Sequence, residues 1–308
     1  MQVGCRAITT FDAIQGKPLA AWLLYPTHDP AQPTSFGPYP LELAHDGAPI
    51  GDALTLVALS HGNGGTPWSH RGLACHLARE GFAVLMIEHP GNNRRDNSLG
   101  TPDGRVKAAL LGHRPRHVSL AVDAALADPL LGPRLDIDTR GYGIIGESIG
   151  GYTALAVAGG RVWTLPDELD MARIAAMSPA EMQQLAFEVD TTPDPRLRAA
   201  VLLVPAVDFF SAPGALAAVD LPILLRTGER DPLCPTARIL SVLSALPDPS
   251  KLSSLEVPGA GHFSLQTPYP PALARIPPAA DPPGFDRAGY QPVFFADVAG
   301  FLRESLSG

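Results

Sequence analysis

The sequence has little cysteine, few charged residues and no long hydrophobic run. Its three cysteines, Cys5, Cys75 and Cys234, are odd in number and far apart, so they predict reduced thiols rather than a disulfide framework. Only 18% of the 308 residues are charged, and 31 acidic side chains outnumber 23 basic ones. Because no basic cluster is present, we expect no nucleic acid or anionic membrane surface as partner. No run is apolar enough to span a bilayer, and residues 1–17 lack the apolar core of a signal peptide, so we expect a cytoplasmic protein without membrane insertion.

What the chain does contain is a regular alternation of apolar runs and helical stretches. The middle runs are apolar without alternating polar residues, which is typical of strands buried on both faces of a parallel sheet. The expected strands are 19–26, 54–61, 82–89, 141–146, 199–206, 221–228 and 251–258. Helix signals lie between them, at 66–81, 116–128 and 148–159. This pattern predicts an α/β fold, in which helices flank a mostly parallel central sheet.

Three segments depart from this alternation. Residues 27–51 are rich in proline and glycine and predict a loop. Residues 161–197 hold two short helical patterns between prolines, and we interpret them as a helical cap or lid inserted into a single domain that spans 1–308. Residues 264–292 contain eight prolines, which predicts a long loop rather than ladders or a long helix.

Two motifs compete for the segment "GYGIIGESIGGYTALA". Gly146-Glu147-Ser148-Ile149-Gly150 fits G-x-S-x-G, in which a serine occupies a tight turn between a strand and a helix. Gly141, Gly143 and Gly146 also fit the dinucleotide fingerprint G-x-G-x-x-G. That fingerprint requires its glycines in the turn after a strand, whereas two of these lie inside the apolar run. The pattern therefore favours Ser148 as a nucleophile.

The candidate base follows by elimination. In hydrolases with this motif the chain order is serine, then an acid, then histidine. Of nine histidines only His262 follows Ser148, on the glycine-flanked segment "VPGAGHFSL" after an expected strand. His262 would take the proton from Ser148 and return it to the leaving group. His61 precedes Ser148, so we expect a structural role for it.

Three residues compete for the acid. Asp231 lies in the turn after the expected strand 221–228, where sheets of this class place functional residues. Asp208 follows the preceding strand, and Glu229 is two residues before Asp231. We favour Asp231, which would hold the imidazole in the right tautomer, and we keep Asp208 as the main alternative and Glu229 as a further one.

An acyl-transfer enzyme also needs two backbone N–H donors for the oxyanion. One is expected from Ile149, directly after the nucleophile. The glycine-rich turn in "LSHGNGGTPW" follows an early strand, and we expect the second donor there, from Asn63. The alternative interpretation is a turn that only begins a helix.

Together, "SHGNGGTPWSHRGLACHLAREGFAV", the Ser148 segment and "GAGHF" resemble an α/β-hydrolase of the group similar to dienelactone hydrolases and platelet-activating-factor acetylhydrolases. The resemblance runs from about residue 10 to the C-terminus and includes "WLLYPT". It implies the α/β-hydrolase fold and a metal-free serine esterase. Two differences stand out. Dienelactone hydrolases often use a cysteine where this chain has Ser148. The acetylhydrolases tend to take their acid from the earlier strand, which is the strand that Asp208 follows.

The remaining predictions concern residues near these motifs. Trp68 and Trp163 are candidates for lining an acyl pocket, with ordinary packing as the alternative. We expect Glu147 to have a buried or salt-bridged structural role and Cys234 to be a small buried thiol. Histidines and cysteines show no zinc-ligand spacing, so we expect no metal and no cofactor.

These observations predict a serine esterase that acts on a small-molecule ester through an acyl-enzyme, with a triad of Ser148, Asp231 and His262. Hydrolysis of lactones or polyesters and acyl transfer to an alcohol use the same residues and stay open. A non-catalytic ligand-binding protein of the same fold is the alternative from another class. The pattern leaves the acyl chain length and the oligomeric state open.

Overall fold

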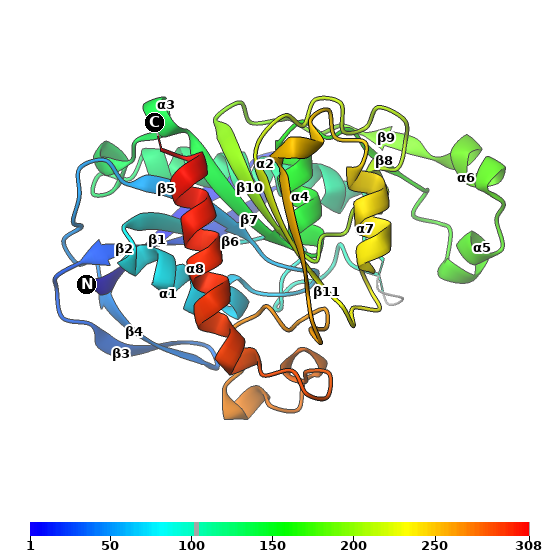
Figure 1. Cartoon of the computed structure of the whole chain (residues 1–308). Coiled ribbons are helices and arrows are strands. Elements are labelled where there is room, and N and C mark those ends of the chain that lie inside the picture. Colours follow the sequence, from blue (N-terminus) through cyan, green and yellow to red (C-terminus); the bar gives the residue numbers. More distant parts are fainter. Residues whose placement is uncertain (102–104, 308) are drawn as a thin grey trace.

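The computed structural model describes residues 1–101 and 105–307, and a ten-stranded sheet forms its centre (Figure 1). In spatial order the strands are β12 (Leu252–Val257), β11 (Ile223–Gly228), β10 (Leu197–Leu203), β7 (Tyr142–Glu147), β5 (Thr55–Ser60), β6 (Phe82–Glu88), β2 (Lys17–Thr27), β1 (Gln2–Asp12), β4 (Tyr39–His45) and β3 (Gln32–Phe36). From β12 to β6 every neighbouring pair is parallel. β2 then pairs antiparallel with both β6 and β1. The sheet is therefore mixed but mostly parallel, as predicted.

Helices cover both faces of this sheet. The α-helices of the body are α1 (Arg71–Arg79), α2 (Ala108–Leu126), α3 (Ile137–Arg140), α4 (Ile149–Val157), α7 (Thr236–Leu243) and α8 (Arg287–Ser305). Short 3-10 turns are η1 (Pro67–His70), η2 (Gly132–Arg134), η3 (Asp208–Phe210) and η4 (Pro249–Lys251). One buried cluster joins α1 and α8 to one face of the sheet, and a second joins α2, α4 and α7 to the other.

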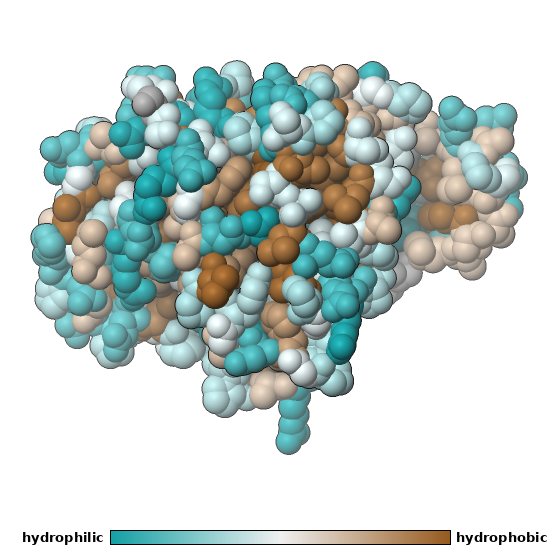
Figure 2. All heavy atoms as spheres, in the orientation of Figure 1, coloured by the Kyte–Doolittle hydropathy of each residue, from teal (hydrophilic) through white to brown (hydrophobic). Residues whose placement is uncertain are grey.

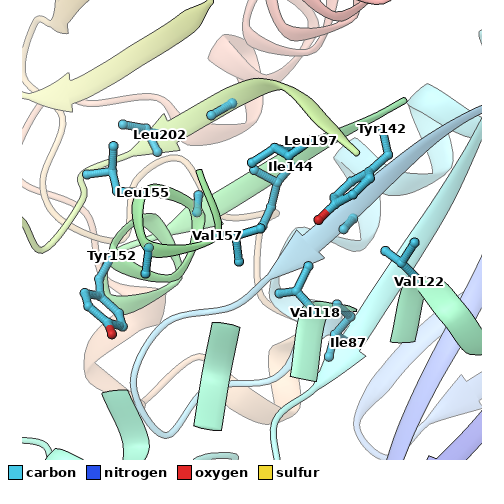
Figure 3. Close-up of a cluster of buried hydrophobic side chains, with 14 of the residues drawn as sticks. Ile87, Val118, Val122, Tyr142, Ile144, Tyr152, Leu155, Val157, Leu197 and Leu202 are labelled. Carbon is cyan, nitrogen blue, oxygen red and sulfur yellow. The ribbon is translucent and has the colours of Figure 1, made fainter. Parts of the chain in front are cut away.

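The parallel strands are apolar throughout because both of their faces are buried. Along β5, Leu56 and Ala58 belong to one cluster, whereas Val57 and Leu59 belong to the other. Figure 3 shows part of the cluster that contains α2, α4 and α7, where Val118 of α2 and Leu155 of α4 lie over the sheet. None of the helices in the described residues is long and apolar enough to cross a membrane.

All seven strands expected from apolar runs are present, but the loop predicted for 27–51 is wrong. This segment forms the antiparallel hairpin of β3 and β4, which pairs Gln32 with Leu43 and Phe36 with Tyr39. Pro33 lies in β3, which is the outermost strand, and there a proline without an N–H loses no ladder bond on its free side. The proline-rich composition therefore predicted a loop where the structure has an edge hairpin.

The segment 161–197 contains the two short helices that the sequence predicts, α5 (Met171–Ala175) and α6 (Pro179–Leu185). An antiparallel pair, β8 (Val162–Thr164) and β9 (Phe187–Val189), connects them to the body. The helices project away from the sheet, at the right in Figure 1, and their end shows apolar spheres among polar ones in Figure 2. Met171, Leu185 and Phe187 are among the exposed apolar side chains. The action of segment 161–197 as a cap or lid stays a prediction.

The proline-rich loop after His262 is shorter than expected. It contains the turns η5 (Pro271–Leu273) and η6 (Pro277–Ala279) and ends at Asp286, because α8 begins at Arg287 rather than after residue 292. The Asp286 side chain caps the helix by accepting from the Gly289 N–H. Pro292 lies inside α8 and removes one backbone hydrogen bond, but burial of residues such as Phe294 and Val298 offsets that loss.

Candidate active site

Ser148 occupies the turn between β7 and α4, at the carboxyl edge of the sheet. Its backbone has φ 54° and ψ −116°, a combination that an L-residue rarely adopts and that surrounding contacts must hold. The Ser148 N–H donates to the Leu203 carbonyl of β10, and its own carbonyl accepts from the Ala206 N–H. The side chain is partly exposed. A strained, accessible serine in this turn is the geometry expected of a nucleophile elbow.

Glycines around Ser148 let the chain segments approach closely. A Cβ on Gly146 would lie 2.7 Å from the Gly151 nitrogen, and one on Gly151 would lie 2.9 Å from Pro205 Cα. A Cβ on Gly150 would overlap the carbonyl of Ser60 at the end of β5. The small residues of G-x-S-x-G are therefore required by backbone packing on both sides of the elbow.

The competing dinucleotide pattern does not form a phosphate loop. Gly141 precedes β7, and Gly143 lies within it, where a Cβ would lie 2.9 Å from a methyl carbon of Leu302. Gly143 makes room for α8, and Gly141 has φ 63° and would meet the Arg196 carbonyl with a Cβ, so of the three glycines only Gly146 belongs to the turn after the strand.

His262 and Asp231 lie together at the same edge of the sheet as Ser148. The strand register aligns Glu147 with Leu203, Leu203 with Arg226, and Arg226 with Leu255, so the segments that follow these strands emerge side by side. The two side chains are buried, and His262 Nδ1 lies 2.7 Å from Asp231 Oδ2. Asp231 Oδ1 accepts from the N–H groups of Leu233 and Cys234. The carboxylate is thus oriented by the backbone and presents its other oxygen to the imidazole.

The other two acid candidates make different contacts. Asp208 has a side chain 70% exposed and forms an ion pair with Arg238 at 2.6 Å. Glu229 Oε2 accepts from the Gly259 N–H at 2.6 Å, which ties the turn after β11 to the loop that carries His262. Of the three candidates, the structure brings Asp231 to the imidazole.

Glu147 forms a buried polar cluster directly under the elbow. It accepts from His70 Nε2 at 3.0 Å and from Gln266 Nε2 at 2.5 Å. Burial raises the pKa of Glu147, but the His70 charge and hydrogen bond outweigh it and hold the pKa below its usual value. Because Gln266 follows His262 by four residues, this carboxylate connects the nucleophile turn with the base loop. The buried, paired role expected of Glu147 is confirmed, whereas His70 and Gln266 had no signal in the sequence.

The predicted oxyanion donors lie on either side of Ser148. Ile149 is the first residue of α4, so its N–H has no partner within the helix. Asn63 lies in the turn after β5, and its Oδ1 accepts from Asn92 Nδ2 at 2.6 Å. The neighbouring Gly62 approaches the elbow closely, since a Cβ there would lie 3.7 Å from Ser148 Cβ. Their action on an oxyanion stays a prediction.

The two tryptophans lie in different surroundings. Trp68 is buried and stacks on Phe36 with ring centroids 3.7 Å apart, and it also contacts Trp22. Trp163 lies in β8, where the Arg161 guanidinium is 6.0 Å from its ring centre. These contacts give both rings packing partners, and a contact with substrate stays a prediction for each.

Comparison with known proteins bears on the fold. No family model matches the chain. A solved structure of a ferulic acid esterase from Streptomyces cinnamoneus matches with a TM-score of 0.67 at 20% identity, over 99% of this chain and 90% of that one. A dienelactone hydrolase from Anabaena variabilis matches with a TM-score of 0.57 at 19% identity, over the full length of both chains. The chain has the α/β-hydrolase fold. Its fold class and its predicted resemblance are confirmed at this level.

Curated relatives of this chain come from Mycobacterium tuberculosis. They are the uncharacterized proteins Rv2307c of strain H37Rv and MT2364 of strain CDC 1551, and each is 27% identical over 212 residues, or 69% of this chain. The match spans 64% of the length of those relatives.

Cys234 lies close to the predicted acid and the predicted base. Three potential ligand atoms lie within 4.8 Å of one another, one each from Asp231, Cys234 and His262. Burial, followed by the Asp231 charge, raises the pKa of Cys234 to about 12, so the thiol stays protonated and is a poor metal ligand. The Asp231 carboxylate and the His262 imidazole are already hydrogen-bonded to each other. This donor set fits an acid–base pair better than a cation site.

Three buried histidines form a chain beneath β5. His117 Nε2 lies 2.9 Å from Gln15 Oε1, an acceptor, so this nitrogen carries the proton and His117 Nδ1 accepts. His89 Nδ1 therefore donates to it at 3.2 Å, and His89 Nε2 accepts from Ser60 Oγ at 2.9 Å. In these tautomers both rings are neutral and each ring nitrogen has a hydrogen-bond partner. His61 Nδ1 likewise donates to the Gly62 carbonyl, in keeping with the structural role expected of it.

We expect these histidines to make the fold sensitive to acid. Burial and the nearby Arg114 guanidinium lower the pKa of His61 to about 3, and burial lowers the pKa values of His89 and His117. The unfolded chain takes up these protons below about pH 6.5, but the folded chain does not, so stability is lost as pH falls. Each histidine contributes a slope of about 1.4 kcal/mol per pH unit, or about 4 kcal/mol per pH unit for all three.

Urea unfolding at pH 7.5, 6.5 and 5.5 measures this slope. His117→Gln is expected to lower the slope of the free energy of unfolding against pH by the contribution of about one proton. His28→Gln, at an exposed position, is expected to leave this slope unchanged. A free energy of unfolding that stays constant between pH 7.5 and 5.5 would contradict the prediction.

Proposed function

We propose that the chain is a serine hydrolase that cleaves a small-molecule carboxylic ester through an acyl-enzyme on Ser148. One observation carries the proposal: a buried carboxylate and imidazole, 2.7 Å apart, lie at the sheet edge where Ser148 is held in a strained turn. In this arrangement Asp231 orients the imidazole and His262 is the base.

In the first step, His262 Nε2 accepts the proton of the Ser148 hydroxyl, and Ser148 Oγ bonds to the ester carbonyl carbon. The carbonyl oxygen takes the negative charge and is stabilised by the N–H groups of Ile149 and Asn63. The imidazolium that forms is stabilised by the Asp231 carboxylate. His262 then gives its proton to the alkoxide oxygen, the C–O bond breaks, and the alcohol leaves.

In the second step, water replaces the alcohol. His262 removes a proton from the water, the hydroxide oxygen bonds to the acyl carbon, and the Ser148 ester bond breaks as its Oγ regains a proton. An alcohol in place of water would give acyl transfer. An internal ester would give a hydroxy acid without loss of a separate alcohol, which is the lactone alternative.

The solved structures with this fold support an ester or lactone substrate, because one is a ferulic acid esterase and another a dienelactone hydrolase. At 20% and 19% identity they support the class of reaction and not a particular substrate.

Fluorophosphonate labelling tests the proposal. We expect one label per chain, mapped by peptide mass to Ser148 and prevented by prior addition of p-nitrophenyl esters. The Ser148→Ala variant should take no label, whereas Ser244→Ala, at an exposed serine that follows the last residue of α7, should label like the wild type. Hydrolysis of esters from acetate to dodecanoate then measures the size of the acyl pocket.

Two outcomes separate the alternatives. A methyl ester formed in the presence of methanol would assign acyl transfer alongside hydrolysis. A folded wild type that neither labels nor cleaves any ester would instead favour a non-catalytic binding protein.

A further inference from the structure

Arg114 of α2 places a guanidinium in the interior with no exposed surface. Its Nε donates to Thr153 Oγ1 at 3.0 Å and its Nη1 to Asn92 Oδ1 at 2.6 Å. Its Nη2 donates to Ser60 Oγ at 3.0 Å and to the backbone carbonyl of His61. All four acceptors are neutral. Within residues 1–101 and 105–307, no carboxylate accepts a hydrogen bond from this cation.

A buried cation without a counter-ion is unfavourable for folding. Burial lowers the pKa of Arg114 to about 9, which still leaves the group positively charged at neutral pH. Four hydrogen bonds to neutral groups and the attraction of the Glu147 carboxylate offset part of this desolvation penalty, whereas an apolar residue of similar length would pack without it. Fold stability therefore gives no reason for a cation at this position.

The bonds of Arg114 converge on the two segments that carry the predicted oxyanion donors. Asn92, which accepts from Arg114, donates to Asn63 Oδ1 at 2.6 Å. Thr153, which also accepts from Arg114, donates to the Ile149 carbonyl at 2.9 Å. One guanidinium thus links the turn after β5 with the first turn of α4.

We propose that Arg114 is a positioning residue for the oxyanion hole: it holds the two segments that carry the predicted donors in register, and it places behind them a positive charge that is hydrogen-bonded only to neutral groups. The inference rests on the proposed function. The negative charge that develops on the substrate oxygen would add to the attraction that the Glu147 carboxylate exerts on this cation. The His61 carbonyl belongs to the same peptide unit as the Gly62 N–H, so a cation bound to that carbonyl also polarises the turn.

The test compares Arg114→Met, which removes the charge and the bonds, with Arg114→Lys, which keeps the charge. Each variant is measured for kcat and KM with a p-nitrophenyl ester and for inhibition by a trifluoromethyl ketone, which forms an oxyanion on Ser148. We expect Arg114→Met to lower kcat by about 30- to 100-fold, because loss of one oxyanion donor costs about 10²–10³. KM should change by less than about threefold, the inhibition constant should rise in parallel with the fall in kcat, and Arg114→Lys should recover about tenfold.

A merely structural role predicts a different pattern. Arg226→Met is the matched control, since Arg226 is a buried arginine that pairs with Asp297 at 2.6 Å on the α8 face. It should lower thermal stability and leave kcat and the inhibition constant unchanged. The inference is overturned if folded Arg114→Met keeps the kcat of the wild type, or if kcat falls while inhibition by the ketone does not.

If Arg114→Met does not fold, Thr153→Val removes one of the four bonds at nearly constant volume. We then expect kcat to fall by about three- to tenfold with a parallel rise in the inhibition constant, and an unchanged kcat overturns the inference. Failure of the two ideas is distinguishable. Wild type that is not labelled at Ser148 contradicts the proposed function, whereas labelled wild type with fully active Arg114 variants contradicts this inference alone.

Discussion

Asp231→Asn is expected to lower kcat for ester hydrolysis about 10⁴-fold, with KM changed by less than about threefold. Asp231 Oδ1 accepts from two backbone N–H groups, at Leu233 and Cys234, so an asparagine must keep its oxygen there. Its NH₂ group then faces His262 Nδ1, where the carboxylate oxygen lay at 2.7 Å. A donor at that place favours the tautomer with the proton on Nε2, which cannot accept the proton of Ser148.

Asp208→Asn is the matched comparison, because it makes the same chemical change at the rival acid. Its carboxylate is largely exposed and pairs with Arg238, an interaction worth little to stability. We expect kcat within about twofold of the wild type. Steady-state kinetics of the two variants side by side decide between the acids. A large loss in Asp208→Asn with little loss in Asp231→Asn would assign the acid to the earlier strand.

Gly150→Ala is expected to destabilise the protein and remove most of its activity. The added methyl group would overlap the Ser60 carbonyl oxygen and lie 2.8 Å from its carbon, and neither backbone atom can move without shifting the end of β5. We expect a loss on the order of 3 kcal/mol, a lower melting temperature by roughly 5 °C, and a fall in kcat of at least about 100-fold, because the turn with Asn63 follows β5 directly.

Gly300→Ala controls for the change itself. Gly300 lies inside α8, and a Cβ there would have no heavy atom within 4 Å outside its own helix. Alanine favours a helix over glycine by about 0.5–1 kcal/mol, so this variant should be slightly more stable and fully active. Thermal unfolding and ester kinetics of both variants measure the difference. A Gly150→Ala protein with the stability and kcat of the wild type would contradict the close packing at the elbow.

Local patterns predicted much of the sheet. The central strands are apolar on both faces, so their runs are visible without knowledge of their neighbours. β1 was not predicted, because its buried and exposed residues follow no clean alternation along Gln2–Asp12. The β3–β4 hairpin was missed because proline is tolerated in a strand mainly at the edge of a sheet or near a strand end, and these places are properties of the assembled sheet.

The candidate site likewise has residues that the sequence predicts and residues that it cannot tell apart. Ser148 and His262 could be predicted from the sequence, since the G-x-S-x-G turn has a local requirement for glycine and a single histidine follows it. Asp231 and Asp208 both follow strands that end at the same edge, so their position along the chain does not separate them. What distinguishes Asp231 from Asp208 is the contact between Gly228 and the Ala260 backbone. This contact brings the turn after β11 against the loop that carries His262.

The sequence by itself determined the strand–helix alternation and the glycine-rich turn at Ser148, because each depends on neighbours a few residues apart. The roles of nucleophile, acid and base stay predictions. Only the tertiary structure decided which carboxylate meets the imidazole, that His70 and Gln266 hold Glu147 under the elbow, and that Arg114 joins the two oxyanion segments. These partners are separated by up to 119 residues. No pattern along the chain marks such contacts, because they arise only when strands and helices pack at one edge of the sheet.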